Sequence, residues 1–322
     1  MAVLTKGKTL PENFTQSAAR GASTGVPPHQ QAYRWVILLL LWLLYFSFGV
    51  VIRAPSPLDT PILQDLHMTY GQMGFVLGSW QMTYIVFAIC AGVIMDRWGI
   101  RRSIFFGALV IALSALLRSA STGFISLLFF VALFGIGGPM ISIGCPKTIA
   151  TWFQGKERGT AIGIYSTGPW IGSMVSLAAT NSVVMPLTHH SWRMTFLWYG
   201  VVSLIIALLW WVLAKDVDGR TSAERFNVLR VLKDLLRVRR VRLILLSGLL
   251  GFGIMHGYFA WLPKILEDGG MSAAEAGVAS ALPFLTSIPA VLILPRYTKA
   301  GFRDWMIGIL AVIASLSILW VV

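Results

Sequence analysis

Two ionisable side chains stand inside long apolar stretches of the sequence, where charge is expensive. Arg53 ends an uncharged run that begins at Trp35, and His256 lies in the run His-Gly-Tyr-Phe-Ala-Trp-Leu-Pro. An arginine in apolar surroundings needs a watery cavity or an anion beside it, and its planar fork suits an oxyanion. Arg53 is therefore a candidate anion-binding residue, unless its side chain snorkels to the outer interface. His256 is either a substrate or proton contact or a hydrogen-bonded packing group.

Other side chains in the same apolar stretches have the polarity and shape to line a cavity with these two. They are Gln81, Tyr84, Tyr165, Tyr258 and Trp261. The sequence shows no paired carboxylates, no nucleophile–base pair and no phosphate-binding loop, so we do not expect an enzyme. The adjacent His189 and His190 are too few for a metal site, and neither a metal nor another cofactor is expected.

A charged motif joins the ends of two apolar stretches at residues 92–102, Gly-Val-Ile-Met-Asp-Arg-Trp-Gly-Ile-Arg-Arg. Its Asp96 is expected to pair with a basic group at a helix end: Arg97, Arg101, Arg102 or Arg158. Such a pair would hold helix ends together in one conformation and release them in another. Simple anchoring at a membrane surface would explain the arginines, but not Asp96 or the glycines Gly92 and Gly99.

The elements that position these residues are apolar segments of membrane-spanning length. Of the 322 residues, 56% are hydrophobic and 12% are charged, whereas ordinary soluble domains carry about 25% charged residues. Most of the segments suit a hydrocarbon core of about 30 Å. The segments lie at about 34–58, 72–95, 103–119, 124–150, 159–183, 194–214, 241–263, 274–295 and 304–322. The sequence thus predicts an all-α polytopic membrane protein with about nine transmembrane helices.

The net charge of +13 does not indicate a nucleic-acid partner, because the charge follows membrane topology. With the N-terminus in the cytoplasm, 21 of the 26 Lys and Arg residues fall on the cytoplasmic side, as the positive-inside rule requires. The first 33 residues lack the apolar core of a secretory signal, so the first segment is expected to be an uncleaved anchor. We expect a multi-pass protein of the cell (inner) membrane, and free Cys90 and Cys145 rather than a disulfide.

The longest polar interruption, residues 215–240, contains apolar residues at helical spacing between basic ones. This pattern favours an amphipathic helix on the inner membrane surface, and the alternative is a solvated linker. The predicted organisation is a polar cytoplasmic tail at 1–33, a six-helix bundle at 34–214, this linker, and a partial bundle at 241–322.

A weak internal repeat supports that division. Shifting the sequence by 202 residues places the motif at 96–102 on residues 298–304, so that Gly99 meets Gly301 and Arg101 meets Arg303. Two copies of a six-helix unit would need roughly 400 residues. With six helices plus three, we expect that the last three are lacking, because the sequence is a fragment or because a partner completes the bundle.

Several motifs resemble those of major facilitator superfamily transporters. The charged motif at 92–102 matches the loop between their second and third helices at every defining position. Trp152-Phe153 with Glu157-Arg158-Gly159 is similar to their fourth-to-fifth helix connection. Gly163 with Gly168-Pro169-x-x-Gly172 is similar to their fifth helix, and Trp192–Phe196 to the entry of the sixth. The resemblance implies a helical bundle that works by alternating access, with the 92–102 motif, Arg158 and the fifth-helix residues in gating.

The fifth-helix motif has a physical reading within this resemblance. Glycines four residues apart (Gly159 and Gly163, Gly168 and Gly172) let helices approach closely and slide against the opposite half. Pro169 would weaken the helix at that point.

The region around Arg53 resembles the first helix of anion-handling branches of the superfamily, the organic-anion and the cyanate or nitrate-like carriers. In those carriers an arginine of this region contacts the substrate. The region around His256 resembles their seventh helix. Two departures matter: Ile52 stands where some organic-anion carriers have an acidic residue, and Val131 stands where many proton-coupled members have arginine. No Asp or Glu lies deep in the nine segments, so proton symport through a buried carboxylate is not expected.

The function predicted from the sequence is transport of a small anionic solute across a lipid bilayer, active or facilitative, by a monomer. The alternative is a membrane sensor or scaffold that keeps the fold without transporting.

Overall fold

The computed structural model describes residues 32–215, 237–297 and Ile309. Four predicted regions lie wholly or almost wholly outside these residues: the N-terminal tail up to residue 31, nearly all of the amphipathic segment within 215–240, the repeated motif at 298–304, and the ninth segment except Ile309. Eight of the nine predicted segments coincide with helices. The structure therefore does not confirm nine helices, and it does not support the expected lack of three more.

The described chain is entirely helical. Its elements are α2 (Tyr33–Arg53), η2 (Ser56–Leu58), α3 (Asp59–Asp65), α4 (Tyr70–Trp98), α5 (Ile100–Ser119), α6 (Phe124–Trp152), α7 (Gly155–Ser166), α8 (Gly168–Ala179), η3 (Thr180–Val184), α9 (Met185–Leu187), α10 (Trp192–Leu213), α12 (Arg239–Asp268) and α13 (Ala273–Tyr297). Seven helical stretches are long and apolar enough to cross a membrane: Tyr33–Asp65, Tyr70–Trp98, Ile100–Ser119, Phe124–Trp152, Gly155–Leu187, Trp192–Leu213 and Arg239–Asp268.

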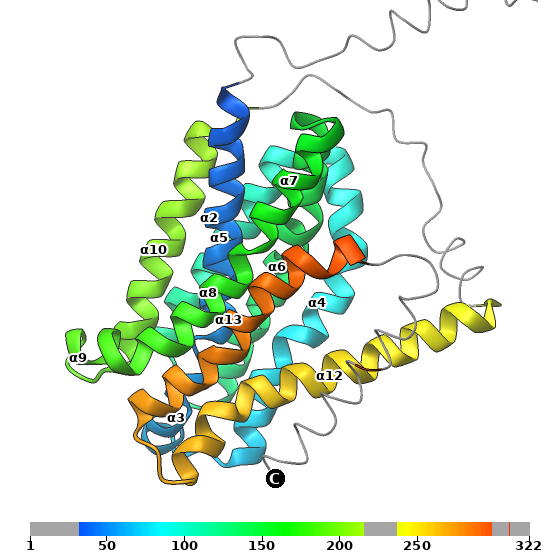
Figure 1. Ribbon diagram of the computed structural model, residues 1–322. Coiled ribbons are helices and arrows are strands. Elements are labelled where there is room, and N and C mark those ends of the chain that lie inside the picture. Colours follow the sequence, from blue (N-terminus) through cyan, green and yellow to red (C-terminus); the bar gives the residue numbers. More distant parts are fainter. Residues whose placement is uncertain (1–31, 216–236, 298–308, 310–322) are drawn as a thin grey trace, which may run out of the picture.

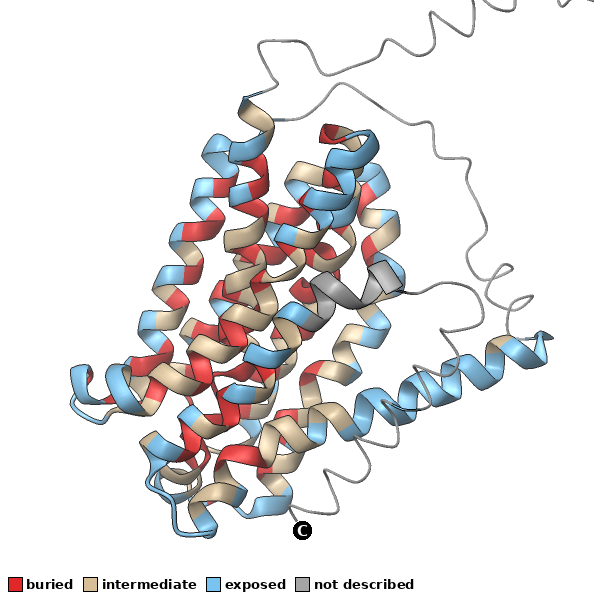
Figure 2. Ribbon diagram, viewed as in Figure 1, coloured by how far each residue is buried: buried red, intermediate tan, exposed pale blue. Residues whose placement is uncertain are grey.

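Elements α2 to α10 form one bundle, which we call the first half; α12 and α13 are the second half. In the first half α4 packs on α6, α5 packs on α6 and α10, and α2 packs on α8. The second half joins through α13, which lies along α8, while the first part of α12 extends away from the bundle (Figure 1). Buried residues follow the inner faces of the first-half helices, and exposed ones follow their outer faces (Figure 2). Outer faces rich in large apolar residues, such as Phe75 and Phe129, suit contact with lipid.

The bundle has two ends, named here after the elements that mark them. The α7 end holds the beginning of α2, the end of α4 and the beginning of α7. The α3 end holds the end of α2, α3 and the connection between α12 and α13 (Figure 1).

Prolines shape the chain at the α3 end. Ala54 and Pro55 keep helical backbone angles (φ −52°, ψ −34° and φ −65°, ψ −36°), but Pro55 has no N–H to donate to the carbonyl of Val51. The buried Arg118 of α5 donates to that carbonyl instead, with Nη1 2.8 Å from the oxygen. The side chain of a second helix thus completes the end of α2.

A side-chain donor replaces a missing backbone N–H again one turn later. Pro61 leaves the carbonyl of Pro57 without its helical donor. Nδ2 of Asn181, in η3, donates to this oxygen over 2.8 Å, and it also donates to the carbonyl of Ala273 in the second half over 3.2 Å.

Glycines set the distance between α2 and α8. A Cβ at Gly172 would lie 2.1 Å from the carbonyl oxygen of Phe46, and one at Gly49 would lie 2.3 Å from that of Pro169. Gly168 and Gly172 therefore permit close approach, as expected, but their partner is α2 of the same half and not the opposite half. At Gly159 a Cβ would meet nothing within 4 Å.

Two helix breaks agree with their sequences. The predicted weak point at Pro169 coincides with the end of α7 at Ser166 and the beginning of α8 at Gly168, since proline fits the first turn of a helix. The motif at 92–102, in contrast, is not the loop that the sequence predicted. Most of it is helical, and Gly99 alone separates α4 from α5. Gly99 has φ +83°, a left-handed backbone conformation that glycine adopts without strain.

Candidate anion-binding site

Arg53 is the last residue of α2, and its side chain is buried, with 6% of its surface exposed. Its Nε has no hydrogen-bond acceptor, and no carboxylate of the described residues pairs with its guanidinium group. The side chain lies between helices rather than extending to a surface. A buried cation without a counter-ion is costly, so the arrangement favours a negatively charged partner.

Two phenylalanines of the second half flank this cation. The guanidinium carbon of Arg53 lies 5.6 Å from the ring centroid of Phe259 in α12 and 5.4 Å from that of Phe284 in α13. Aromatic rings at this distance stabilise a cation without consuming its hydrogen bonds. The two rings also contact each other, at 4.7 Å between centroids. Arg53 therefore lies where both halves meet, with no carboxylate of the described residues paired to its guanidinium group.

His256 of α12 belongs to the same region. It lies within electrostatic range of Arg53, its ring stacks on Phe252 at 3.8 Å, and it is 5.5 Å from the ring of Trp80 in α4. Its Nδ1 is 3.2 Å from the carbonyl oxygen of Phe252. The histidine thus has a backbone partner, as the packing interpretation requires, and it also lies within electrostatic range of the buried arginine.

An aromatic row connects His256 with another predicted residue, Tyr165, through the middle of the first half. Consecutive ring centroids along the row are 5.7, 5.6, 4.9, 5.7 and 5.5 Å apart. Its members are Tyr165, Tyr45, Phe48, Phe134, Trp80 and His256. The sequence did not single out Tyr45 or Trp80, because an aromatic residue in an apolar helix is more often ordinary core.

The remaining predicted binding residues are not members of this row. Tyr84 shares a hydrogen bond of 2.5 Å with Ser142 of α6, so its hydroxyl group already has a partner. Oε1 of Gln81 is buried without a hydrogen-bond donor. Tyr258 contacts the ring of Phe259, and Trp261 lies 6.1 Å from the ring of Tyr70.

Asp59 was missed. It lies one residue beyond the first predicted segment, yet it is 1% exposed, and neither carboxylate oxygen has a hydrogen-bond partner in the described part of the chain. Asp59 lies outside the nine segments, so the expectation that no Asp or Glu lies deep within them stands, but an acid directly after a segment is buried. After Leu58 the chain does not leave the bundle, because α3 folds back and buries Leu58 and Ile62. Periodicity alone could not show that return.

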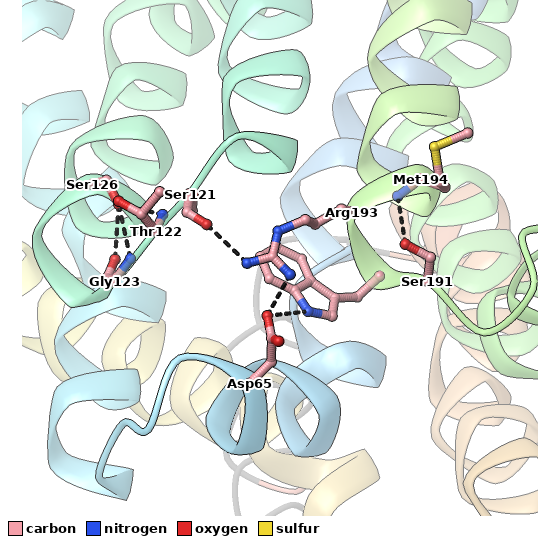
Figure 3. Close-up of polar contacts among 9 residues, drawn as sticks. Asp65, Ser121, Thr122, Gly123, Ser126, Ser191, Arg193 and Met194 are labelled. Atoms are coloured by element: carbon pink, nitrogen blue, oxygen red, sulfur yellow. Dashed lines mark hydrogen bonds and ion pairs between the residues drawn. The ribbon is translucent and has the colours of Figure 1, made fainter.

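Surface contacts fix α3 against the first half. Arg193 of α10 forms an ion pair with Asp65, and its Nη2 donates to the carbonyl of Ser121 over 3.1 Å (Figure 3). Nε1 of Trp192 donates to the same carboxylate over 3.2 Å. The Trp192-Arg193 pair at the entry of α10 thus holds α3, and with it the segment that follows Arg53.

At the α7 end, the ion pairs differ from those expected. Asp96 pairs with Lys147 of α6 at 3.2 Å, and not with Arg97, Arg101, Arg102 or Arg158. Arg101 donates instead to the carbonyl of Trp211 over 2.6 Å. Glu157, next to Arg158, accepts two hydrogen bonds from Arg34, of 2.6 and 2.9 Å. These contacts join helix ends within the first half.

Comparison with known proteins places this geometry in a family. The family model described as Major Facilitator Superfamily matches residues 39–322. The chain belongs to the major facilitator superfamily. Solved transporter structures share its fold: a bacterial homologue of the human lysosomal transporter Spinster in an inward-facing conformation has a TM-score of 0.64 and 20% identity, covering 80% of this chain and 60% of that one. A D-xylose–proton symporter has a TM-score of 0.60 and 16% identity, covering 80% and 67%.

Several curated relatives are named as transporters of hexuronate, galactarate/D-glucarate or nitrate/nitrite. The hexuronate transporter of Bacillus subtilis is 25% identical over 243 residues, 72% of this chain and 57% of that protein. A probable galactarate/D-glucarate transporter of Escherichia coli is 24% identical over 326 residues, covering 90% and 70%. A probable nitrate/nitrite antiporter of Thermus thermophilus is 26% identical over 292 residues, covering 85% and 65%. The chain thus spans 57% to 70% of these relatives' lengths.

Proposed function

We propose that this membrane protein carries a small organic anion across the bilayer by alternating access, and that Arg53 binds the anion's carboxylate. The observation that carries the proposal is a buried, aromatic-flanked guanidinium group without a carboxylate partner among the described residues. A carboxylate matches the planar fork of arginine with two parallel hydrogen bonds. Because Arg53 contacts Phe259 and Phe284 of the second half, a bound anion would link the two halves.

The relatives support a sugar acid as the solute. Hexuronate, galactarate and glucarate each carry at least one carboxylate and several hydroxyl groups. His256, Gln81 and Tyr258 would then contact the hydroxyl groups, and the row from Trp80 to Tyr165 would supply apolar surface. Nitrate, a planar oxyanion, is the second solute class that the same arginine fork fits.

The orientation belongs to the proposal as well. The basic residues of the sequence put the N-terminus, and with it the α7 end, in the cytoplasm of the cell whose inner membrane holds the protein. The halves meet at the α3 end through Thr60 and Glu267, whose oxygens are 2.6 Å apart. Closure at this end corresponds to an inward-facing state, and alternating access requires a second state with these contacts broken. In that state the motif at 92–102 would gate the α7 end.

Ligand-induced stabilisation of the purified chain in detergent tests the binding step. D-glucuronate and D-glucarate should raise its melting temperature, and uncharged D-glucose should not. Arg53→Gln should weaken binding about 30-fold to about 5,000-fold, because loss of one partner of a buried charge pair costs about 2–5 kcal/mol. The matched control is Arg34→Gln, which removes the same charge from the other end of α2, at an ion pair with Glu157.

If the Arg53 variant bound these anions with unchanged affinity, the assignment of Arg53 as the anion-binding residue would be refuted. Uptake by proteoliposomes then tests transport itself: a chain that binds these anions but moves none of them is the sensor or scaffold of the alternative.

A further inference from the structure

Asp59 is a buried acid for which the proposed anion site gives no role. It is the first residue of α3, six residues after Arg53, at the contact between the two halves. With 1% of its surface exposed and no donor to either carboxylate oxygen among the described residues, it is shielded from bulk water and has no hydrogen bond there to stabilise a negative charge. An ionised carboxylate in such surroundings is strongly unfavourable, whereas the neutral acid is tolerated.

The charged neighbours of Asp59 do not compensate for that burial. The groups of the described residues that act on it are Glu267 and Lys264, both from α12. Glu267 is acidic and already accepts a hydrogen bond from Thr60 over 2.6 Å. Nζ of Lys264 pairs with Asp268 at 2.7 Å. One neighbour repels a negative charge on Asp59, and the positive charge of the other is shared with another acid.

The position of Asp59 connects its protonation to the shape of the protein. Thr60, the next residue, donates to Glu267 of the second half, and Asn181 joins the carbonyl of Pro57 to that of Ala273. These bonds close the α3 end around Asp59. Separating the halves would break them and admit water to the carboxyl group, which could then ionise.

We propose that Asp59 is a proton-binding site, occupied while the two halves are in contact at the α3 end and emptied when they separate. On separation the O–H bond of the carboxyl group breaks, the proton passes to water, and the carboxylate keeps the electron pair. The closed arrangement holds the proton more tightly than the open one, so lower pH favours closure. The linkage itself needs no anion; its role in coupling proton movement to transport rests on the proposed function.

A metal cation is a poorer occupant of this site. Sodium-sized ions take several oxygen ligands, usually carboxylates, carbonyls and waters. Two of the backbone oxygens that the prolines leave without helical donors, those of Val51 and Pro57, already accept from Arg118 and Asn181. Asp59 itself offers two carboxylate oxygens in a site that is shielded from bulk water. A single proton needs no more ligands than that.

Distance measurement between the halves tests the proposal. Spin labels at Gln64→Cys in α3 and Met271→Cys in the connection between α12 and α13 occupy exposed positions at the α3 end. The native Cys90 and Cys145 are first replaced by alanine. Without any anion, the ratio of the short-distance to the long-distance population should fall as pH rises, by up to tenfold per pH unit. Asp59→Asn, which cannot ionise, should hold the short-distance population at every pH.

Two further variants keep the test decisive. Asp59→Glu should restore a pH dependence, and Glu275→Gln, which neutralises an exposed acid near the beginning of α13, should leave the pH dependence unchanged. The proposal would be overturned if the distances in the parent protein did not change with pH. It would also be overturned if Asp59→Asn showed the same pH dependence as the parent. A third contrary result would be a rise in the short-distance population when sodium replaces choline in the buffer at constant pH. Absent sugar-acid binding would refute only the proposed function, because the distances are measured without anion.

Discussion

Replacing Arg118 by methionine and Pro55 by alanine, singly and together, tests how the site-bearing end of α2 is held. In the folded chain Nη1 of Arg118 supplies the donor that Pro55 cannot give to the carbonyl of Val51. The backbone at Ala54 and Pro55 is already helical. An alanine at position 55 would therefore direct its own N–H toward the same carbonyl oxygen.

The magnitude follows from that one hydrogen bond. In the parent background, Arg118→Met leaves a buried carbonyl without a donor, which costs about 1–3 kcal/mol. In the Pro55→Ala background, the carbonyl keeps a backbone donor, so this part of the cost disappears. Arg118 also bonds to Ser114 over 3.0 Å, but that loss is common to both backgrounds and cancels. We expect a coupling energy of about 1–3 kcal/mol between the two substitutions.

The assay is equilibrium unfolding in mixed detergent–dodecyl sulfate micelles, followed by circular dichroism, for the parent, both single variants and the double variant. The free energy of unfolding lost on Arg118→Met should be smaller when alanine occupies position 55. Additivity within about 0.5 kcal/mol would refute the reasoning, because it would mean that the arginine does not replace the missing N–H. The cycle is insensitive to the charge removed with Arg118, since both legs remove it.

Two other predictions concern packing and the α7 end. Gly172→Ala should destabilise the fold by about 1–3 kcal/mol, because the new Cβ would lie 2.1 Å from the carbonyl oxygen of Phe46; Gly78→Ala, where a Cβ meets nothing within 4 Å, is its control in the same unfolding assay. A double-mutant cycle of Asp96→Asn and Lys147→Met should give a coupling below about 1 kcal/mol, since both side chains are two-fifths exposed or more; a larger value would show that the pair is shielded from solvent.

Helix positions and the family could be predicted from the sequence because both depend on local patterns. Segments of apolar residues gave eight helices close to their observed bounds, since a backbone in lipid must satisfy its own hydrogen bonds. The motif at 92–102 identified the superfamily that the family model confirms. Its detail was less accurate: Asp96 pairs with Lys147, 51 positions along the chain. Sequence proximity favoured the arginines of the motif, but helix packing selects the partner.

The sequence by itself determined that this is a helical membrane protein of the major facilitator superfamily with a cation at Arg53, because apolar length, charge and motif spacing are properties of the chain read locally. Only the tertiary structure decided what surrounds that cation and which acids are buried. Phe259 and Phe284 reach Arg53 from helices more than 200 positions away, and Asp59 is buried because α3 turns back into the bundle. Burial and charge pairing are set by contacts between distant segments, so a side chain's role depends on where the fold places it.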